Sequence, residues 1–225
     1  MLTQKILLIV FLFKLTNLLG QIPVHEEPLH RPVFQNKEIR ILNVLLPPGD
    51  TTQYHIHEKP SLFIFFTNTT TGSQLQGREA LIGKSTAGGI LFENLAPPNI
   101  RTHRVWNADK DTFHVMDVEL LFNETRFVHN VLTLPKLELE INTTWVRAYR
   151  LTLLKDDGFT LKNEKHPYIL ISLNTPLVET KPNGKTQYQT LKQGGFFNIQ
   201  RRHSFFIKNK SDNVAQFILL ELPTQ

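Results

Sequence analysis

Short apolar runs alternate with turn-forming residues along most of the chain. The runs are rich in β-branched and aromatic residues, and Pro, Gly, Asn and Asp bound them; examples are SLFIFF at 61–66, YILISL at 168–173 and AQFILLEL at 215–222. Helical periodicity is scarce, and its best candidate lies near residues 131–141. Many short strands at regular spacing predict an all-β barrel or sandwich.

The order of runs and turns also repeats within the chain. VLLPPGDTTQYHIHEKPSLFIFF at 44–66 resembles LTLLKDDGFTLKNEKHPYILISL at 151–173, and GGILFENLAPPNIRTHRVWN at 88–107 resembles GGFFNIQRRHSFFIKN at 194–209. Each copy runs strand, acidic turn with glycine, strand, variable loop, Gly-Gly turn and a pair of strands around a histidine. The pattern predicts two tandem copies of one β unit that meet near residues 142–148.

The first twenty residues have the layout of a secretory signal peptide. Lys5 precedes an apolar run from Ile6 to Phe13, and small or polar residues lead to Gly20 and Gln21, where we expect cleavage. The alternative is a membrane anchor, but Lys14 interrupts the run and leaves it short for a bilayer span. We therefore expect a secreted or periplasmic protein with no membrane association after signal removal.

The composition excludes cysteine chemistry and gives no sign of a nucleic-acid partner. The 225 residues contain no cysteine, so no disulfide can stabilise the fold and no lipid-modified cysteine can anchor the protein to a membrane. The formal net charge is +5, and removal of the two lysines of the signal segment leaves +3, which is too little to indicate nucleic-acid binding. Four N-x-S/T sequons would accept glycans only in a eukaryotic secretory pathway: Asn68, Asn123, Asn142 and Asn209.

The motifs of the first copy resemble those of the cupin family, whose fold is a jelly-roll β-barrel. Gly49 is followed by five residues and then by His55 and His57, and Pro98 precedes His103 by five residues. Asn107 follows His103 at the family spacing. The resemblance covers roughly residues 38–223 and implies tandem cupin-type jelly-roll barrels, with His55, His57 and His103 as metal ligands.

The chain also departs from the family pattern. The family glutamate should lie at Ser61 or Leu62, and Ile100 replaces a motif glycine. In the second copy, Leu161 and Asn163 match His55 and His57, His203 is the only histidine left, and Asn209 lies two residues too far from it. The resemblance therefore implies a metal site in the first barrel and none in the second. The expected layout is a signal peptide at 1–20, an extended N-terminal arm at 21–37, a first barrel at 38–141 and a second, degenerate barrel at 142–225.

His55 and His57 suit metal binding on physical grounds too. Successive residues of a strand point to opposite faces, so these two imidazoles point together, and Gln53 shares their side. A third histidine from a distant strand completes a site that leaves positions open for water or substrate. Imidazole suits Fe, Mn, Ni, Cu and Zn alike, so one divalent transition metal is expected without a choice among them. The alternative to a metal site is that His55 and His57 are only two polar residues on a strand.

Three further residues are candidates for the surroundings of the site. Asn107 shares the side of His103 and could orient a ligand, and Gln53 could do the same. His114 starts the apolar face of its strand, so we expect a hydrogen-bonded core residue and the first candidate to line a pocket. The other face carries Asp117 and Glu119, which we expect in solvent or between the barrels.

Three functions remain open from the sequence. The first is a metal-dependent oxygenase, isomerase or lyase acting on a small molecule. Its weakness is that no carboxylate shares the face of the ligands in the first motif. The second is a non-catalytic protein that binds a small molecule or saccharide and retains a relic of the metal site. The third is a structural protein whose arm at 21–37 covers a sheet edge or pairs with a second copy in a homodimer.

Overall fold

A computed structural model describes residues 21–224 except 124–126, 128 and 163. The expected signal peptide at 1–20 lies outside the described residues. Within the described ranges there are nineteen strands and two 3-10 turns, η1 (Val24–Glu26) and η2 (Pro182–Gly184), and there is no α-helix. None of the described helical segments is long and apolar enough to cross a membrane. The helix considered for 131–141 is wrong, because strand β11 (Leu137–Asn142) occupies its end.

The first barrel consists of two five-stranded sheets. Sheet A has the order β1-β4-β9-β6-β7, and sheet B has the order β2-β3-β10-β5-β8. The strands of sheet A are β1 (Ile22–Pro23), β4 (His55–His57), β9 (Arg101–Asn107), β6 (Thr69–Leu75) and β7 (Ala80–Ser85). Those of sheet B are β2 (His30–Gln35), β3 (Ile39–Leu46), β10 (Phe113–Leu120), β5 (Ser61–Phe65) and β8 (Ile90–Glu93).

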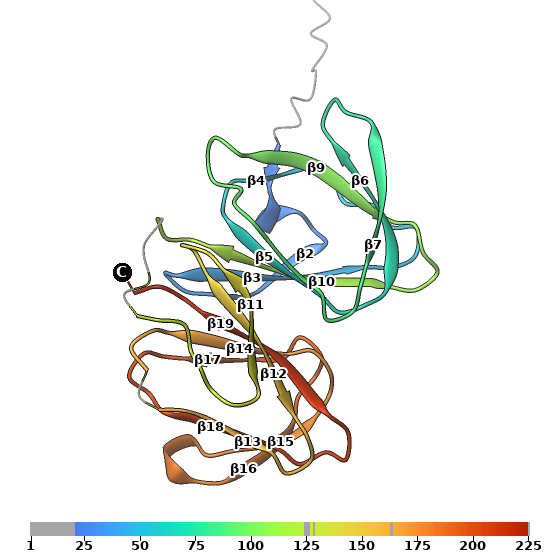
Figure 1. Ribbon diagram of the computed structural model, residues 1–225. Helices are drawn as coiled ribbons and strands as arrows, with labels where there is room; N and C mark the ends of the chain where they lie inside the picture. Colours follow the sequence, from blue (N-terminus) through green and yellow to red (C-terminus); the bar gives the residue numbers. More distant parts are fainter. Residues whose placement is uncertain (1–20, 124–126, 128, 163, 225) are drawn as a thin grey trace, which may run out of the picture.

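The N-terminal arm belongs to this barrel. β1 pairs in parallel with β4, and β2 pairs antiparallel with β3, so the arm adds one strand to each sheet. Between them, η1 crosses from one sheet to the other, as the blue segment in Figure 1 shows. The arm therefore covers the edges of β4 and β3 and closes one side of the barrel.

The second barrel repeats the arrangement with nine strands. Sheet C has the order β11-β12-β19-β14-β17, and sheet D has the order β13-β18-β15-β16. The remaining strands of sheet C are β12 (Arg147–Leu153), β19 (Ala215–Glu221), β14 (Tyr168–Ser172) and β17 (Phe196–Ile199). Those of sheet D are β13 (Gly158–Leu161), β18 (Phe205–Asn209), β15 (Leu177–Thr180) and β16 (Gln187–Thr190). β11 pairs with β12, so this barrel begins at Leu137, before the boundary expected at residue 142.

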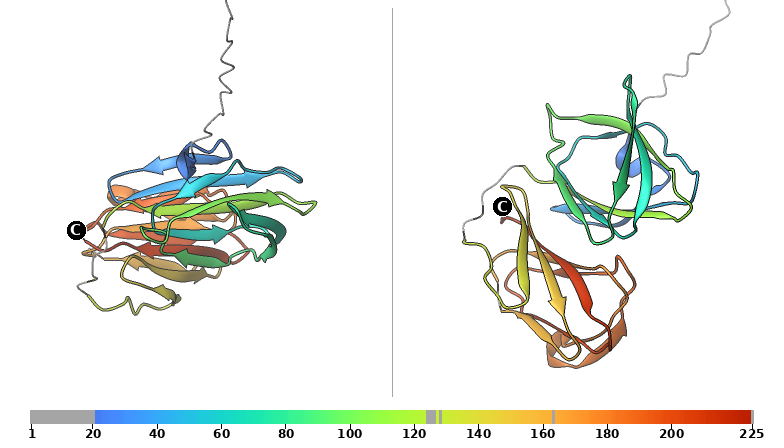
Figure 2. Two further views of the ribbon diagram at one scale, coloured as in Figure 1. Left: turned by 90° about the horizontal axis from the view of Figure 1, so that it is seen from above. Right: turned by 45° about the vertical axis from the view of Figure 1, so that its right-hand side comes forward.

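The two barrels pack through sheets B and C. Ile39, Ile64 and Met116 of sheet B meet Ile171 and Ile218 of sheet C in one buried cluster. Figure 2 shows the two barrels stacked in this way, the blue-to-green one against the yellow-to-red one. The central strand β10 of sheet B is consequently buried on both faces, one toward its own barrel and one toward the second barrel.

A pair of asparagines confirms the internal repeat and fixes its register. The side-chain amide of Asn107 donates to the carbonyls of Leu46 and Asp111, and that of Asn209 donates to those of Leu153 and Asn213. Each side-chain oxygen accepts a backbone N–H two residues later. Both asparagines are buried, so the sequon at Asn209 is closed to glycans in the folded protein.

This register corrects the place of one histidine. His55 lies opposite His103 in the first barrel, and Leu161 lies opposite Phe205 in the second. Phe205, and not His203, therefore stands where the first barrel has His103. Leu161 and Phe205 have no atom that can bind a metal, and His203 is an exposed residue whose Nδ1 lies 3.1 Å from the carbonyl oxygen of Arg201.

Candidate metal centre

Four histidines meet inside the first barrel. β4 carries His55 and His57, which point to the same face because they are two residues apart. His103 on β9 lies directly opposite His55, so its side chain shares that face. The fourth is His30 at the start of β2, where the arm enters sheet B. The three residues predicted from the sequence are thus brought together, and a fourth joins them from the N-terminal arm.

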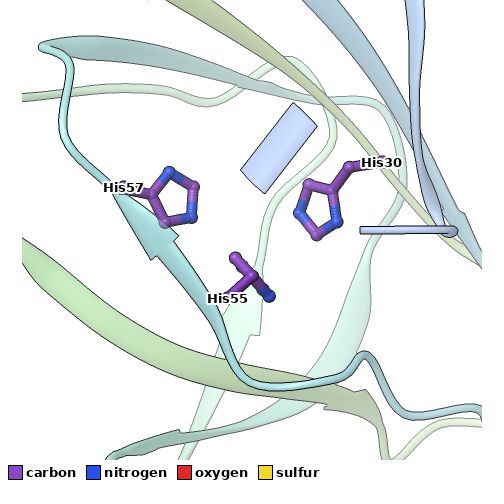
Figure 3. Close-up of side chains that lie close together, drawn as sticks. All are labelled: His30, His55 and His57. Atoms are coloured by element: carbon purple, nitrogen blue, oxygen red, sulfur yellow. The ribbon is translucent and has the colours of Figure 1, made fainter. Parts of the chain in front are cut away.

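The distances between the rings fit a single ion. His30, His55 and His57 each offer one ring nitrogen, and these nitrogens all lie within 4.8 Å of one another; Figure 3 shows the three rings facing a common space. Nε2 of His57 lies 3.1 Å from Nε2 of His103. Two nitrogens bound at right angles to one metal, with bonds of about 2.1 Å, lie about 3 Å apart.

Three of the four imidazoles, those of His30, His55 and His103, are held by their Nδ1 atoms. Nδ1 of His30 lies 2.7 Å from the Glu27 carboxylate, and Nδ1 of His55 lies 2.9 Å from the carbonyl oxygen of Gln53. Nδ1 of His103 lies 3.3 Å from Oγ of Ser73. These contacts fix the rings and leave Nε2 of each as the available ligand atom.

Burial keeps three of the histidines, His55, His57 and His103, neutral. Burial, with a smaller contribution from His30, lowers the pKa of His55 to about 4. Burial and the neighbouring His55 lower the pKa of His103 to about 3, and burial and His103 hold the pKa of His57 well below its usual value. Neutral imidazole is the form that binds a metal, so no proton has to leave these three rings near neutral pH.

Two ring nitrogens of the cluster are buried and have no hydrogen-bond partner among the described residues: Nε2 of His55 and Nδ1 of His57. Nε2 of His55 is the one that lies toward the other rings. Burying a polar atom without a partner is unfavourable, and native structures rarely contain one without a reason. A metal bound there would satisfy it, and the all-nitrogen donor set suits a transition metal.

A carboxyl group lies beside the cluster. Oδ2 of Asp117 on β10 is 3.5 Å from Nδ1 of His57, and both residues are buried. Burial, together with the nearby Glu119, raises the pKa of the Asp117 carboxyl well above its usual value. The expectation that Asp117 and Glu119 lie in solvent or between the barrels is wrong. Asp117 faces the barrel interior, and Glu119 is buried and paired with Arg40 at 2.7 Å.

The other predicted neighbours take different roles. His114 points away from the cluster, toward the second barrel, where its ring lies 4.4 Å from that of Phe66 and Nε2 lies 2.8 Å from Asn43. It does not line the pocket. Asn107 fastens the turn after β9, as described above, and does not touch the four rings. Gln53 contributes its backbone carbonyl to His55, while its side chain is exposed.

A small pocket opens beside the histidines. Its volume is about 180 Å³, and its walls are mainly apolar, with Phe63, Phe65, Phe113 and Val115 among them. His30, His57, His103 and Asp117 form its polar end, and Arg101 and Glu93 are also part of its wall. A metal held by the histidines would be accessible to a molecule in this pocket.

The chain matches no protein-family model and no curated protein sequence. Among solved structures it resembles the bacterial pirin YhhW in complex with nickel(II) from Escherichia coli (TM-score 0.61, 16% identity, 87% of this chain and 91% of that one). It also resembles AerE from Microcystis aeruginosa (0.59, 12%, 88% and 99%) and a salicylate 1,2-dioxygenase from Pseudaminobacter salicylatoxidans (0.59, 11%, 88% and 77%). These likenesses, with the repeated jelly-roll sheets, confirm the predicted fold. The chain is a cupin-fold protein made of two barrels in tandem.

Proposed function

We propose that the first barrel binds one divalent transition metal on His30, His55, His57 and His103, and acts on a small molecule in the adjacent pocket. The observation that carries the proposal is the orientation of the rings. Nδ1 of His30, His55 and His103 contacts a group of the protein, and Nδ1 of His57 lies 3.5 Å from Asp117, so the Nε2 atoms are left for a common ligand. The solved structures it resembles include a nickel complex and a dioxygenase, which is in keeping with a metal-dependent reaction.

The metal would supply Lewis-acid or oxygen-activating chemistry, as an oxygenase, isomerase or lyase requires. The chain's own groups would bind and orient the substrate and exclude water. Phe63, Phe113 and Val115 provide an apolar surface for the substrate body. Asp117 places a buried carboxyl at the polar end of the pocket, where it can hold or accept a proton. The carboxylate that the first motif lacks thus comes from β10.

We further propose that the protein is exported. The support is the sequence of residues 1–20, in which a short apolar run follows a lysine. A protease-accessibility experiment tests this. The outer membrane of the cells is opened, and a protease that does not cross the inner membrane is added. Protection of the protein in that experiment would contradict export.

Metal content tests the central proposal. Residues 21–225, prepared without a histidine tag, should contain about one transition metal per chain by elemental analysis. The His55→Ala/His57→Ala double variant should contain almost none, because a metal site usually weakens by orders of magnitude when two ligands are lost. His203→Ala is the matched control, since this histidine is exposed in the second barrel. Absence of metal from the wild type after reconstitution would refute the site.

A further inference from the structure

We infer that the pocket beside the histidines takes a ligand of about one ring in size that carries no carboxylate, such as a neutral phenol, diol or ketone. The inference rests on the proposed metal function and adds the class of substrate to it. Three features of the pocket carry it: its volume, its apolar walls and the pairing of its single guanidinium.

The volume limits the ligand to a small body. The pocket measures about 180 Å³. An apolar protein cavity of about 150 Å³ binds benzene. Three phenylalanine rings, those of Phe63, Phe65 and Phe113, line the space and favour an apolar or aromatic partner. One ring with one or two oxygens fits this volume.

The charges in the wall disfavour a carboxylate. Among the described residues that line the pocket, Arg101 is the one lysine or arginine. Both of its terminal nitrogens are already bound by Glu93, at 2.5 and 2.6 Å. The guanidinium therefore has its planar, two-point carboxylate contact within the protein.

A carboxylate ligand would have to displace Glu93 to make the same two-point contact with the terminal nitrogens of Arg101. It would then place a second negative charge beside the Glu93 carboxylate in a partly buried site. Asp117, at the inner end, adds no positive charge in either protonation state. A neutral ligand leaves the Arg101–Glu93 pair intact and buries only apolar surface.

The metal itself does not discriminate between carboxylate ligands and neutral ligands, because an oxygen of either kind of ligand can face it. A pair of probes with the same metal-binding group removes its contribution. Catechol and 3,4-dihydroxybenzoate share two adjacent hydroxyls and differ by one carboxylate. We would load the full chain with cobalt(II), measure cobalt content, and titrate each probe while following the visible absorption of the metal.

Catechol should bind the wild type about tenfold more tightly than 3,4-dihydroxybenzoate, which corresponds to the loss of one favourable charge contact. Glu93→Gln keeps the shape of the side chain and frees Arg101, so it should tighten binding of 3,4-dihydroxybenzoate about tenfold and leave catechol nearly unchanged. Adding Arg101→Gln to that variant should remove the gain. This last variant shows whether the gain depends on the guanidinium.

The outcomes separate the inference from the function on which it rests. A chain that holds cobalt but binds the carboxylate probe as well as catechol, or binds neither probe, overturns the inference and leaves the metal site standing. A Glu93→Gln variant with unchanged preference also overturns it. A chain that holds no cobalt overturns the metal site and the inference together.

Discussion

Lowering the pH from 7.5 to 5 should weaken the metal-free protein through the histidines of the site. Burial lowers the pKa of His55 to about 4 and that of His103 to about 3, against 6.5 in the unfolded chain. Below pH 6.5 the unfolded chain takes up protons at these positions and the folded chain does not. The free energy of unfolding therefore falls as the pH drops from 6.5 toward the folded pKa values, and is fully retained above 6.5.

The size of the effect follows from the two pKa values. In this window each pH unit is worth about 1.36 kcal/mol per histidine, so a fall from 6.5 to 5 costs about 2 kcal/mol each and about 4 kcal/mol for the two. A domain has only about 5–15 kcal/mol of stability, so the loss is easily measured. The raised pKa of Asp117 acts in the opposite sense, because the folded state then binds the extra proton as the pH falls.

Urea unfolding at both pH values measures the effect, after removal of metal with a chelator. The His55→Gln/His103→Gln variant separates the two histidines from Asp117, which both proteins retain. The wild type should lose about 4 kcal/mol more than this variant between pH 7.5 and 5. Equal losses in the two proteins would refute the reasoning, because they would mean that the imidazoles are protonated in the folded state.

Two further predictions concern the scaffold. Asn107→Ala and Asn209→Ala each remove the three side-chain hydrogen bonds of a buried asparagine, one of them fully buried, at equivalent turns. Each variant should lose about 2–4 kcal/mol in urea unfolding and keep its metal content. A loss of metal in Asn107→Ala would contradict a purely structural role. Gly72→Ala should cost about 1–3 kcal/mol, because its Cβ would lie 1.8 Å from the Trp106 ring, which would have to move. Gly83→Ala, with no atom within 4 Å, is the control, and equal costs would contradict the steric argument.

Three of the four clustered histidines could be singled out from the sequence because their signals are local. His55 and His57 lie two residues apart on a strand, and His103 is marked by Pro98 and Asn107 at family spacing. His30 lies in a proline-containing arm without periodicity, far along the chain from the others, so nothing in the pattern connects it to them. Its one local mark is Glu27, three residues earlier, which fixes its ring in the structure.

The all-β fold was predictable from the turn and strand patterns. Which side chains of β10 face the pocket and which face the second barrel was not. His114 and Met116 alternate with Val115 and Asp117, and both sets are wholly or partly buried. Alternation identifies a core face only when the other face meets water. Because β10 lies between two interiors, the pattern could not show that Asp117 faces the pocket and His114 the neighbouring barrel.

The packing of sheet B against the second barrel limits how the protein can be divided. A fragment ending near residue 123 would retain every histidine of the site and would still expose Ile39, Leu62, Ile64 and Met116, all buried in the whole chain. Such a surface favours aggregation over independent folding. The boundary between the two repeats therefore does not separate two units that fold independently. Moving the histidine cluster into a smaller protein would require another cover for this face of sheet B.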